Sequence, residues 1–481
     1  MHIRGVIKIL GVFLIIHSLG LLPPILLSLY YHDHQLNVFL ITLAATLGSG
    51  LIFWLSFRNT DGELRRHEGF LVVAAFWVVL SAFSGLPLVI GAHLPFADAF
   101  FEAASAFTTT GATVITHIDA LPKSVLFYRQ ELQWLGGMGI IVLAVAVLPV
   151  LGMGGMQLFR AETPGPMKDE KLTPRIAHTA RTFWIIYMAL TFSMALAYVI
   201  AGMTPFDAIG HSFSTISTGG FSTHDKGLNF YHSLPIEIIT EVFMFLGALN
   251  FSVHFLAYQN RSLMAYLQNP EFKVFAVVVA TIILICAITL TMDSTYSTFG
   301  ESLRHSAFQT ISIITSTGYT TQNFAAWPTF LPVLLIFSSF IGGCSGSTAG
   351  GIKVIRIMLL VKQGYHEILM LIHPAMVHSV KIAGRIYPPS VISGVWGFFA
   401  LYVAVFIIAL LLLMAGGLDQ ITAFSAVATC LNNMGPGLGE VTVNFHSLSE
   451  SNKYILAFCM ILGRLEIMTF LVLLAPGYWR R

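Results

Sequence analysis

The sequence predicts an all-α polytopic membrane protein, a fold class favoured by its composition, its long apolar segments and the placement of its basic residues. Of 481 residues, 56% are hydrophobic and 10% are charged, and the mean hydropathy is +0.78. Soluble globular proteins carry about 45–50% apolar and about 25% charged residues. The composition therefore excludes an aqueous globular fold, and also disordered, coiled-coil and collagen-like chains. The net charge of +2 and the absence of a long basic tract argue against a nucleic-acid partner.

The membrane crossings follow from the length of the apolar segments, because a spanning helix needs about 20 mostly apolar residues. Phe330–Ile341 and Ile352–Val361 are predicted to be the halves of one helix that a run of glycines breaks. With that broken helix we expect ten crossings. The others are Ile9–Tyr30, Val38–Phe57, Phe70–Gly91, Leu132–Leu151, Phe183–Ala201, Val242–Tyr258 extended by Ile236–Thr240, Val274–Thr291, Val391–Met414 and Tyr454–Pro476.

The basic residues orient these crossings. Most Lys and Arg fall in loops on the side of the two termini, including the stretch 160–181. The positive-inside rule then places both termini and the basic loops in the cytoplasm. The stretch 160–181 could dock a regulatory subunit or be an ordinary positive-inside loop.

On the opposite side, four segments are too polar to face lipid and too apolar for ordinary loops: 96–115, 205–222, 299–322 and 418–440. Each is predicted to be a short helix that ends in a polar turn with a glycine, at Gly111, Gly219, Gly318 and Gly435. They recur about every 100 residues, as expected of one unit used four times. The predicted organisation is a two-helix segment, 1–60, followed by pore repeats at 61–160, 161–262, 263–375 and 376–481.

The four turns are candidates for a cation site. Non-helical backbone at membrane depth is tolerated only inside protein or along a water-filled cavity. Four such turns, each preceded by a re-entrant helix, suit assembly around one pseudo-fourfold axis, where carbonyl oxygens replace the water around an ion. Because no turn contains a carboxylate, we expect a monovalent cation. The candidate residues are Thr109, Thr110, Gly111, Ser217, Thr218, Gly219, Ser316, Thr317, Gly318, Asn433, Met434 and Gly435.

The short helices before the turns support this interpretation. Asp98, Asp207 and Asp419 lie near their outer ends, where a carboxylate can cap free N–H groups, and Ser297 or Glu301 could do so in the third copy. The C-terminal ends, which carry partial negative charge, then point toward the cation. The alternative is that these turns only serve helix packing.

The motifs TTTGA, STISTGGFS, IITSTGYTT and LNNMGPGLG, followed by GGCSGSTAGGIK and GRLEI, resemble the TrkH/TrkG/KtrB superfamily of potassium transporters. The last two motifs and the two extra N-terminal helices are most similar to its bacterial TrkH branch. The resemblance covers nearly the whole chain. It implies potassium uptake across the bacterial inner membrane by a homodimer, with potassium bound at the four turns. It also implies gating by cytoplasmic TrkA-type subunits that bind NAD(H) and ATP, whereas no cofactor is expected on this chain.

The fourth turn departs most from the others, since it has Asn432, Asn433 and Met434 where they have Ser or Thr. Unlike the TVGYG filter of potassium channels, each copy has one obligatory glycine. We therefore expect weaker discrimination against sodium.

A gate is predicted below the turns. Five glycines and three Ser or Thr make regular helix unfavourable at 342–351. By resemblance, Gly343, Cys344, Ser345, Gly346, Ser347, Thr348, Ala349 and Gly350 form an intramembrane gate loop; a kink that merely shapes the pore is the alternative. Arg464 is the only basic residue predicted deep within a span, where such residues are rare and usually functional. We expect it to face the pore and to hydrogen-bond the loop, although a structural pair with a carboxylate is also open.

Two other function classes share features with this sequence. Gly343-Cys344-Ser345-Gly346 matches the nucleophile pattern of intramembrane serine proteases, but no later histidine falls inside a predicted span to activate Ser345. A proton- or sodium-coupled potassium symporter would also use broken helices and repeats, but typically two rather than four. The sequence thus favours passive, gated permeation, and we expect no enzyme activity.

Overall fold

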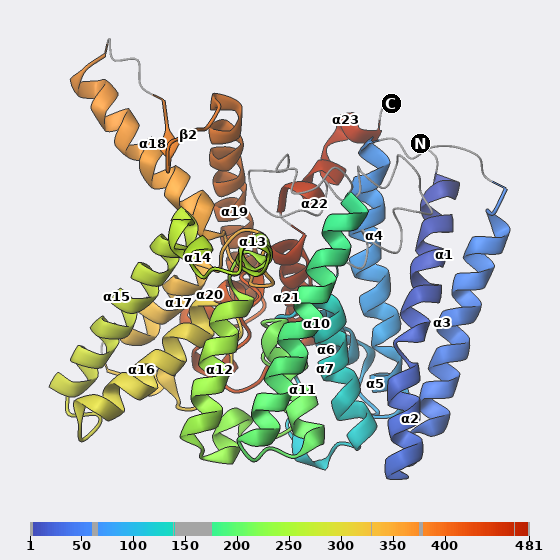
Figure 1. Ribbon diagram of the computed structural model, residues 1–481. Helices are drawn as coiled ribbons and strands as arrows, with labels where there is room; N and C mark the ends of the chain where they lie inside the picture. The colour runs from blue at the N-terminus through green and yellow to red at the C-terminus, as the bar shows by residue number, and fades with distance from the viewer. Residues whose placement is uncertain are drawn as a thin grey trace.

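The computed structural model describes residues 3–59, 66–137, 139, 176–328, 330–374, 379–465 and 467–479. In this part the chain is almost entirely helical, as predicted, and the only β-strands are Lys381–Ile382 (β1) and Arg385–Ile386 (β2). They form an antiparallel hairpin in which Lys381 pairs with Ile386. Figure 1 shows both chain ends on the same side of the molecule, together with α18 (Val354–Ile372) and the hairpin.

The N-terminal segment packs along one edge of the bundle. Its helices are α1 (Ile3–Leu19), α2 (Leu22–Tyr31) and α3 (Leu36–Ser56). α1 lies against α3, and Figure 1 places this pair at the opposite edge from α15 and α16. Gly11 and Gly50 allow the close approach, because a Cβ on Gly50 would lie 2.9 Å from the carbonyl oxygen of Gly11.

The remaining chain repeats one arrangement four times: an outer helix, a half-helix that ends in a turn, and an inner helix. The half-helices, which confirm the four predicted short helices, are α6 (Phe96–Phe107), α11 (Pro205–Ile216), α16 (Phe299–Ile314) and α20 (Gln420–Leu431). The outer helices are α4 (Arg66–Ser84) continued by α5 (Leu86–Ile90), α10 (Ile176–Ile200), α15 (Pro270–Met292) and α19 (Pro389–Ala415). The inner helices begin as α7 (Lys123–Gly137), α12 (Leu234–Gly247), α17 (Leu331–Ile341) and α21 (Glu450–Arg464).

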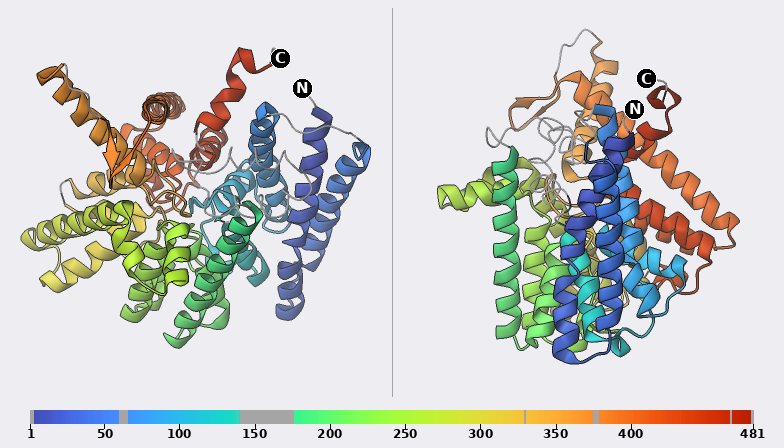
Figure 2. Two further views of the ribbon diagram at one scale, coloured as in Figure 1. Left: turned by 45° about the horizontal axis from the view of Figure 1, so that its top comes forward. Right: turned by 90° about the vertical axis from the view of Figure 1, so that its right-hand side faces the viewer.

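The helix contacts close this arrangement into a circle. Each half-helix packs against the inner helix of its own repeat and against that of the repeat before it. α11 thus contacts α12 and α7, α16 contacts α17 and α12, and α20 contacts α21 and α17. α6 contacts α7 and, across the closure, α21. Figure 2 shows the helices of successive repeats spreading around the shared interior. A cyclic order of contacts brings all four half-helix ends to one place.

Within the described residues, six helices are long and apolar enough to cross a membrane. They correspond to the predicted segments that begin at Ile9, Val38, Phe70, Phe183, Val274 and Val391. Two bent pairs raise the number to eight: α12 with α13 (Phe251–Asn260), and α21 with α22 (Ile467–Leu474). The predicted crossing at Leu132–Leu151 begins as α7, and its continuation lies outside the described residues.

The inner helices are interrupted more often than the sequence predicted. The break between α17 and α18 was expected, and the structure confirms it. Val242–Tyr258 and Tyr454–Pro476 were predicted to be continuous, which is wrong. The first bends by 98° between α12 and α13, and the second by 113° between α21 and α22. No proline lies at the first bend; instead, the backbone of Ala248 and Gly247 accepts hydrogen bonds from another segment, which releases it from the helical pattern.

Short elements complete each repeat. A one-turn 3-10 helix follows every half-helix and its turn, at Ile118–Ala120, Gly227–Tyr231, Phe324–Ala326 and Gly439–Val441. The other elements are α14 (Met264–Gln268) before the third outer helix and α23 (Pro476–Trp479) near the C-terminus. The recurrence of the 3-10 helices strengthens the fourfold internal repeat.

Candidate ion filter and gate

The four turns share one backbone pattern. Each half-helix ends at a C-cap residue: Thr108, Ser217, Thr315 or Asn432. The next residue has a left-handed φ in every copy: 56° at Thr109, 54° at Thr218, 55° at Ser316 and 53° at Asn433. Two residues further comes a glycine with positive φ: Gly111, Gly220, Gly318 or Gly435. Two left-handed residues in such short turns are tolerated because the surrounding protein fixes them.

This pattern corrects the predicted register of the second turn. The glycine equivalent to Gly111, Gly318 and Gly435 is Gly220 (φ 76°), not Gly219. Ser217 is the C-cap of α11, so the predicted triplet Ser217, Thr218 and Gly219 lies one residue too early. Gly219 instead occupies the position of Thr110, Thr317 and Met434.

The turns meet in a closed ring. In three turns, a Cβ added to the glycine would overlap a carbonyl oxygen of the following turn. The pairs are Gly111 with Gly219, Gly220 with Thr317, and Gly318 with Met434. The ring closes where the Cβ position of Gly435 lies 2.8 Å from the carbonyl oxygen of Thr110. Each glycine therefore lets the carbonyl of the next turn approach closely, and in all four the positive φ independently favours glycine.

Side chains in the turns bond to one another. The hydroxyls of Thr108 and Thr110 lie 2.8 Å apart, and those of Thr315 and Thr317 are also 2.8 Å apart in the third copy. In the fourth copy the amide of Asn433 donates to the Thr110 hydroxyl at 2.9 Å and so links the fourth turn to the first. The asparagine that makes this turn unusual is therefore a cross-link between repeats.

Asn432 points away from its neighbours in the ring and anchors the fourth turn to other helices. It accepts a hydrogen bond from Tyr402 at 2.5 Å and donates one to Ser339 at 2.9 Å. Both contacts are fully buried. The fourth turn is therefore bonded to other helices through Asn432 and to the first turn through Asn433.

The outer ends of the half-helices are capped only partly as predicted. Asp419 caps α20 by accepting from the N–H groups of Ile421 and Thr422. In α11 and α16 the caps are Thr204 and Thr298, which the sequence interpretation missed. The carboxylate of Asp207 instead accepts from the Thr204 hydroxyl, and that of Glu301 accepts from Ser297, which precedes the cap Thr298. Neither of the two predicted residues is therefore the N-cap of α16.

The predicted capping role of Asp98 is wrong. Its carboxylate lies 2.6 Å from Nζ of Lys453 on α21, in a buried ion pair. The Asp98 carboxylate therefore lies in the first turn of α6, but it joins the first repeat to the fourth and does not cap the free N–H groups of the helix.

The segment 342–353 lies directly below the ring and touches three repeats. Cys344 and Thr348 donate backbone N–H groups to the carbonyls of Ala248 and Gly247 at 2.9 and 3.3 Å. The Thr348 hydroxyl donates to the carbonyl of Ile216, the last residue of α11, at 3.0 Å. Gly350 donates to the Ser316 hydroxyl at 2.5 Å. A Cβ on Gly350 would overlap the carbonyl oxygen of Asn432.

A carboxylate fixes the outer part of this segment. Oε1 of Glu271, in the first turn of α15, accepts from the N–H of Ser345 at 2.6 Å and from that of Ile355 at 3.2 Å. Glu271 is buried. One side chain thus holds both the segment and the first turn of α18.

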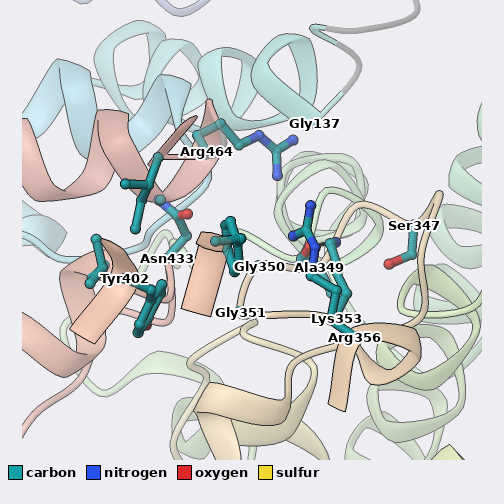
Figure 3. A pocket seen from close by; sticks show the side chains of 14 residues that line it. Gly137, Ser347, Ala349, Gly350, Gly351, Lys353, Arg356, Tyr402, Asn433 and Arg464 are labelled. Atoms are coloured by element: carbon teal, nitrogen blue, oxygen red, sulfur yellow. Dashed lines mark hydrogen bonds between the residues drawn. The ribbon is translucent and has the colours of Figure 1, made fainter. Parts of the chain in front are cut away.

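Arg464 contacts the same segment, and the predicted hydrogen bond is present. Its guanidinium donates to the carbonyl of Thr348 at 2.8 Å and to that of Gly136 at 3.0 Å. It lines a cavity below the ring together with Asn433, Lys353 and Arg356. Figure 3 shows these basic side chains entering the cavity from α21 and from the start of α18.

Lys353 and Arg356 therefore correct the prediction that Arg464 is alone at this depth. Both are 5% exposed and lie at the start of the predicted half-helix Ile352–Val361, on the side that the sequence places nearer the cytoplasm. Lys353 donates to the carbonyl of Ala349, and the guanidinium of Arg356 lies 4.0 Å above the ring of Phe398. Three basic side chains thus line the cavity below the ring, and their positive charge disfavours a cation there.

The family model TrkH, described as a cation transport protein, matches residues 35–480 of this chain. The chain belongs to the TrkH family of cation transport proteins. It is 50% identical over 484 residues to the Trk system potassium uptake protein TrkH of Vibrio parahaemolyticus, with full coverage of both chains. It is 48% identical to TrkH of Escherichia coli K12, again over the full length of both. With TrkG of E. coli K12 the identity is 40%, over 100% of this chain and 99% of that protein.

The fold is also that of a solved relative. The crystal structure of the potassium transporter TrkH from Vibrio parahaemolyticus matches with a TM-score of 0.91 and 47% identity, over all of both chains. Membership of a transport family excludes the serine-protease alternative for Ser345, and the expected absence of enzyme activity follows from the same comparison.

Several residues of this TrkH-family site could not be found from motifs. Gln133 and Lys353 fall inside the predicted helices Leu132–Leu151 and Ile352–Val361, and Glu271 falls just before the one predicted at Val274–Thr291. The one sequence signal for these residues was that each is a polar or charged side chain within or beside an apolar segment. The stretch 160–181, for which a docking role and an ordinary positive-inside loop were both open, lies largely outside the described residues.

Proposed function

We propose that this chain carries out potassium uptake by gated, channel-like permeation through the ring of four turns. The observation that supports it best is the cyclic contact of Gly111, Gly220, Gly318 and Gly435 with the carbonyl of the next turn. Such a ring presents carbonyl oxygens from four sides to one axis. The relatives named above are potassium uptake proteins, which favours potassium as the ion.

The chemistry of the ring suits a monovalent cation. Carbonyl oxygens replace the water around the ion, while the C-terminal ends of α6, α11, α16 and α20 add partial negative charge. The ring residues would be Thr109–Gly111, Thr218–Gly220, Ser316–Gly318 and Asn433–Gly435. Because the hydroxyls of Thr110 and Thr317 are engaged locally, the main-chain oxygens would carry the coordination.

Gly343–Gly350 with Arg464 would form the gate. The segment lies below the ring and is tied to the second, third and fourth repeats. Lys353, Arg356 and Arg464 would add electrostatic repulsion to this steric block. Opening would require loss of the hydrogen bond between Arg464 and Thr348.

The cellular setting belongs to the same proposal. The chain would lie in the bacterial inner membrane with both termini in the cytoplasm, in accord with the bias of its basic residues. It would act as a homodimer, and cytoplasmic TrkA-type subunits that bind NAD(H) and ATP would control the gate. The chain itself would need no cofactor besides the potassium ion that it transports.

Growth rescue of a potassium-uptake-deficient strain on low potassium tests the proposed filter. Gly111→Ala, Gly220→Ala and Gly318→Ala should abolish rescue, because each new Cβ overlaps a carbonyl oxygen of the next turn and each φ is positive. Gly435→Ala should be the mildest, since its nearest contact is 2.8 Å. The control is Gly394→Ala on α19, where a Cβ meets nothing within 4 Å. Normal rescue by all four turn variants, with normal membrane levels, would refute the ring as filter.

A second measurement separates permeation from coupled symport. In proteoliposomes the reversal potential should follow the potassium gradient alone. A shift of that potential under an imposed proton or sodium gradient, with potassium held equal, would contradict channel-like permeation and favour the symporter alternative.

A further inference from the structure

The side chain of Gln133 holds the second turn from behind. Gln133 lies on α7, the inner helix of the first repeat, and is fully buried. Its Nε2 donates to the carbonyl oxygen of Gly219 at 2.7 Å, and its Oε1 accepts from the N–H of Phe221 at 3.0 Å. These two hydrogen bonds fix both the orientation of the Gly219 carbonyl and its distance from α7.

Gly219 is a glycine because of this contact. Its φ is not in the left-handed region, unlike that of Gly220, so backbone conformation does not require it. A Cβ on Gly219, however, would lie 2.5 Å from Cδ, 2.7 Å from Oε1 and 2.8 Å from Nε2 of Gln133. Gln133 and Gly219 are therefore complementary in shape as well as hydrogen-bonded.

Within the part of the chain that the structure describes, this brace occurs at the second turn alone. Among the described residues, no side chain donates a hydrogen bond to the equivalent carbonyls of Thr110, Thr317 and Met434. In the second and fourth repeats the residue equivalent to Gln133 is a buried methionine, Met244 or Met460. The positions are equivalent because each residue comes three places before a glycine that lies against the last residue of a half-helix. These glycines are Gly136, Gly247 and Gly463.

We propose that Gln133 is a selectivity-determining positioning residue of the ring. A carbonyl ring discriminates between ions through the number and field strength of its oxygens and through how closely they approach the ion. Gln133 shares the acceptor capacity of the Gly219 oxygen and prevents the second turn from moving toward a smaller ion. This inference rests on the proposed function, since it assigns a role within the same ring.

The direct test is Gln133→Met, which gives the first repeat the side chain already present in the second and fourth. Full-length protein in proteoliposomes is assayed for rubidium and for sodium flux. Losing a hydrogen bond of this kind changes an equilibrium by a factor of about two to ten, so the sodium-to-rubidium flux ratio should rise by about that factor. Met244→Leu, a change at the equivalent position of the second repeat, should leave the ratio unchanged.

Gln133→Asn supplies a second variant if the methionine variant does not assemble. Its amide is one methylene shorter and cannot hold both Gly219 and Phe221, so it should also raise the ratio, and by less. A purely structural role would lower both fluxes together at a constant ratio. That constant ratio in either folded variant would overturn the inference, whereas absence of selective flux in the unmodified protein would instead overturn the proposed function.

Discussion

The guanidinium of Arg464 donates a hydrogen bond to the carbonyl oxygen of Thr348, 2.8 Å away, and thereby joins α21 to the segment below the ring. Thr348 in turn donates through its hydroxyl to the last carbonyl of α11. One residue of the segment thus connects the inner helix of the fourth repeat to the half-helix of the second. This contact is a direct mechanical link between α21 and the segment.

Replacing Arg464 with Ala should raise the potassium flux measured without a partner subunit. The change removes a charge-assisted hydrogen bond and one of the positive charges in the cavity. Hydrogen bonds of charged groups contribute about 1.5–3 kcal/mol, so a rise of about tenfold or more is expected in proteoliposomes. Arg464→Lys keeps the charge and should give a smaller rise. Unchanged or lower flux in Arg464→Ala would count against the gate.

Glu271 should act on the same segment from the opposite side. Glu271→Ala removes the acceptor for the N–H groups of Ser345 and Ile355, so the segment should be released and partner-independent flux should increase. Glu271→Gln keeps one acceptor oxygen and should retain most of the closure. If both variants show the same flux as the unmodified protein at equal stability, Glu271 does not hold the segment closed.

The ion pair behind the first turn should matter mainly for stability. Glu102 on α6 and Arg129 on α7 are both fully buried, with Nη2 and Oε1 2.5 Å apart, and Glu102 also accepts from the N–H of Val114. Breaking a buried pair costs about 3–5 kcal/mol, so Arg129→Met should markedly lower the thermal unfolding temperature in detergent.

A more exposed pair provides the matched control for that stability experiment. Arg304 pairs with Glu237 at 2.7 Å, but its side chain is 37% exposed. The Glu237 side chain is only 7% exposed, but solvent that reaches Arg304 weakens the pair, so Arg304→Met should lower the unfolding temperature less than Arg129→Met. Equal effects would mean that burial does not set the contribution of the first pair.

His224 in an outer loop should make stability depend on pH. Burial lowers its pKa, but the Asp207 carboxylate 3.7 Å from Nε2 and the hydrogen bond between Nδ1 and Asp119 outweigh burial and raise the net value. A histidine with a raised folded pKa stabilises most below its unfolded pKa of about 6.5, and that contribution is lost as pH rises through the folded pKa. The unfolding temperature should therefore fall from about pH 6 to about pH 9.

The variant His224→Gln isolates this effect, because glutamine does not titrate in that range. Its unfolding temperature should vary less between the two pH values than that of the unmodified protein. An identical pH dependence in both would assign the effect to other groups.

The hydrophobic spacing determined the class of the protein and the place of its repeats. Apolar segments long enough for a membrane, and four polar segments ending in glycine turns, are properties of short stretches of chain. They predicted α6, α11, α16 and α20, the break after α17 and the cap at Asp419, because a helix and its terminus depend on neighbouring residues.

Local patterns misplaced the second glycine for a physical reason. The sequence offered Gly219 and Gly220 together, and only φ distinguishes them. Gly220 meets the left-handed conformation of the turn, whereas Gly219 makes room for Gln133, which is 86 residues away in the chain. A rule based on neighbouring residues cannot predict that Gly219 must leave room for Gln133.

The sequence by itself thus determined a membrane protein of four repeats with polar turns and a glycine-rich break. Tertiary structure alone decided that Gly220 is the second ring glycine, that Lys353 and Arg356 join Arg464 below the ring, and that Asp98 pairs with Lys453. The reason is that charge burial and carbonyl packing depend on residues brought together from different repeats. The energy of each such contact exists only once the repeats that supply its residues have packed together.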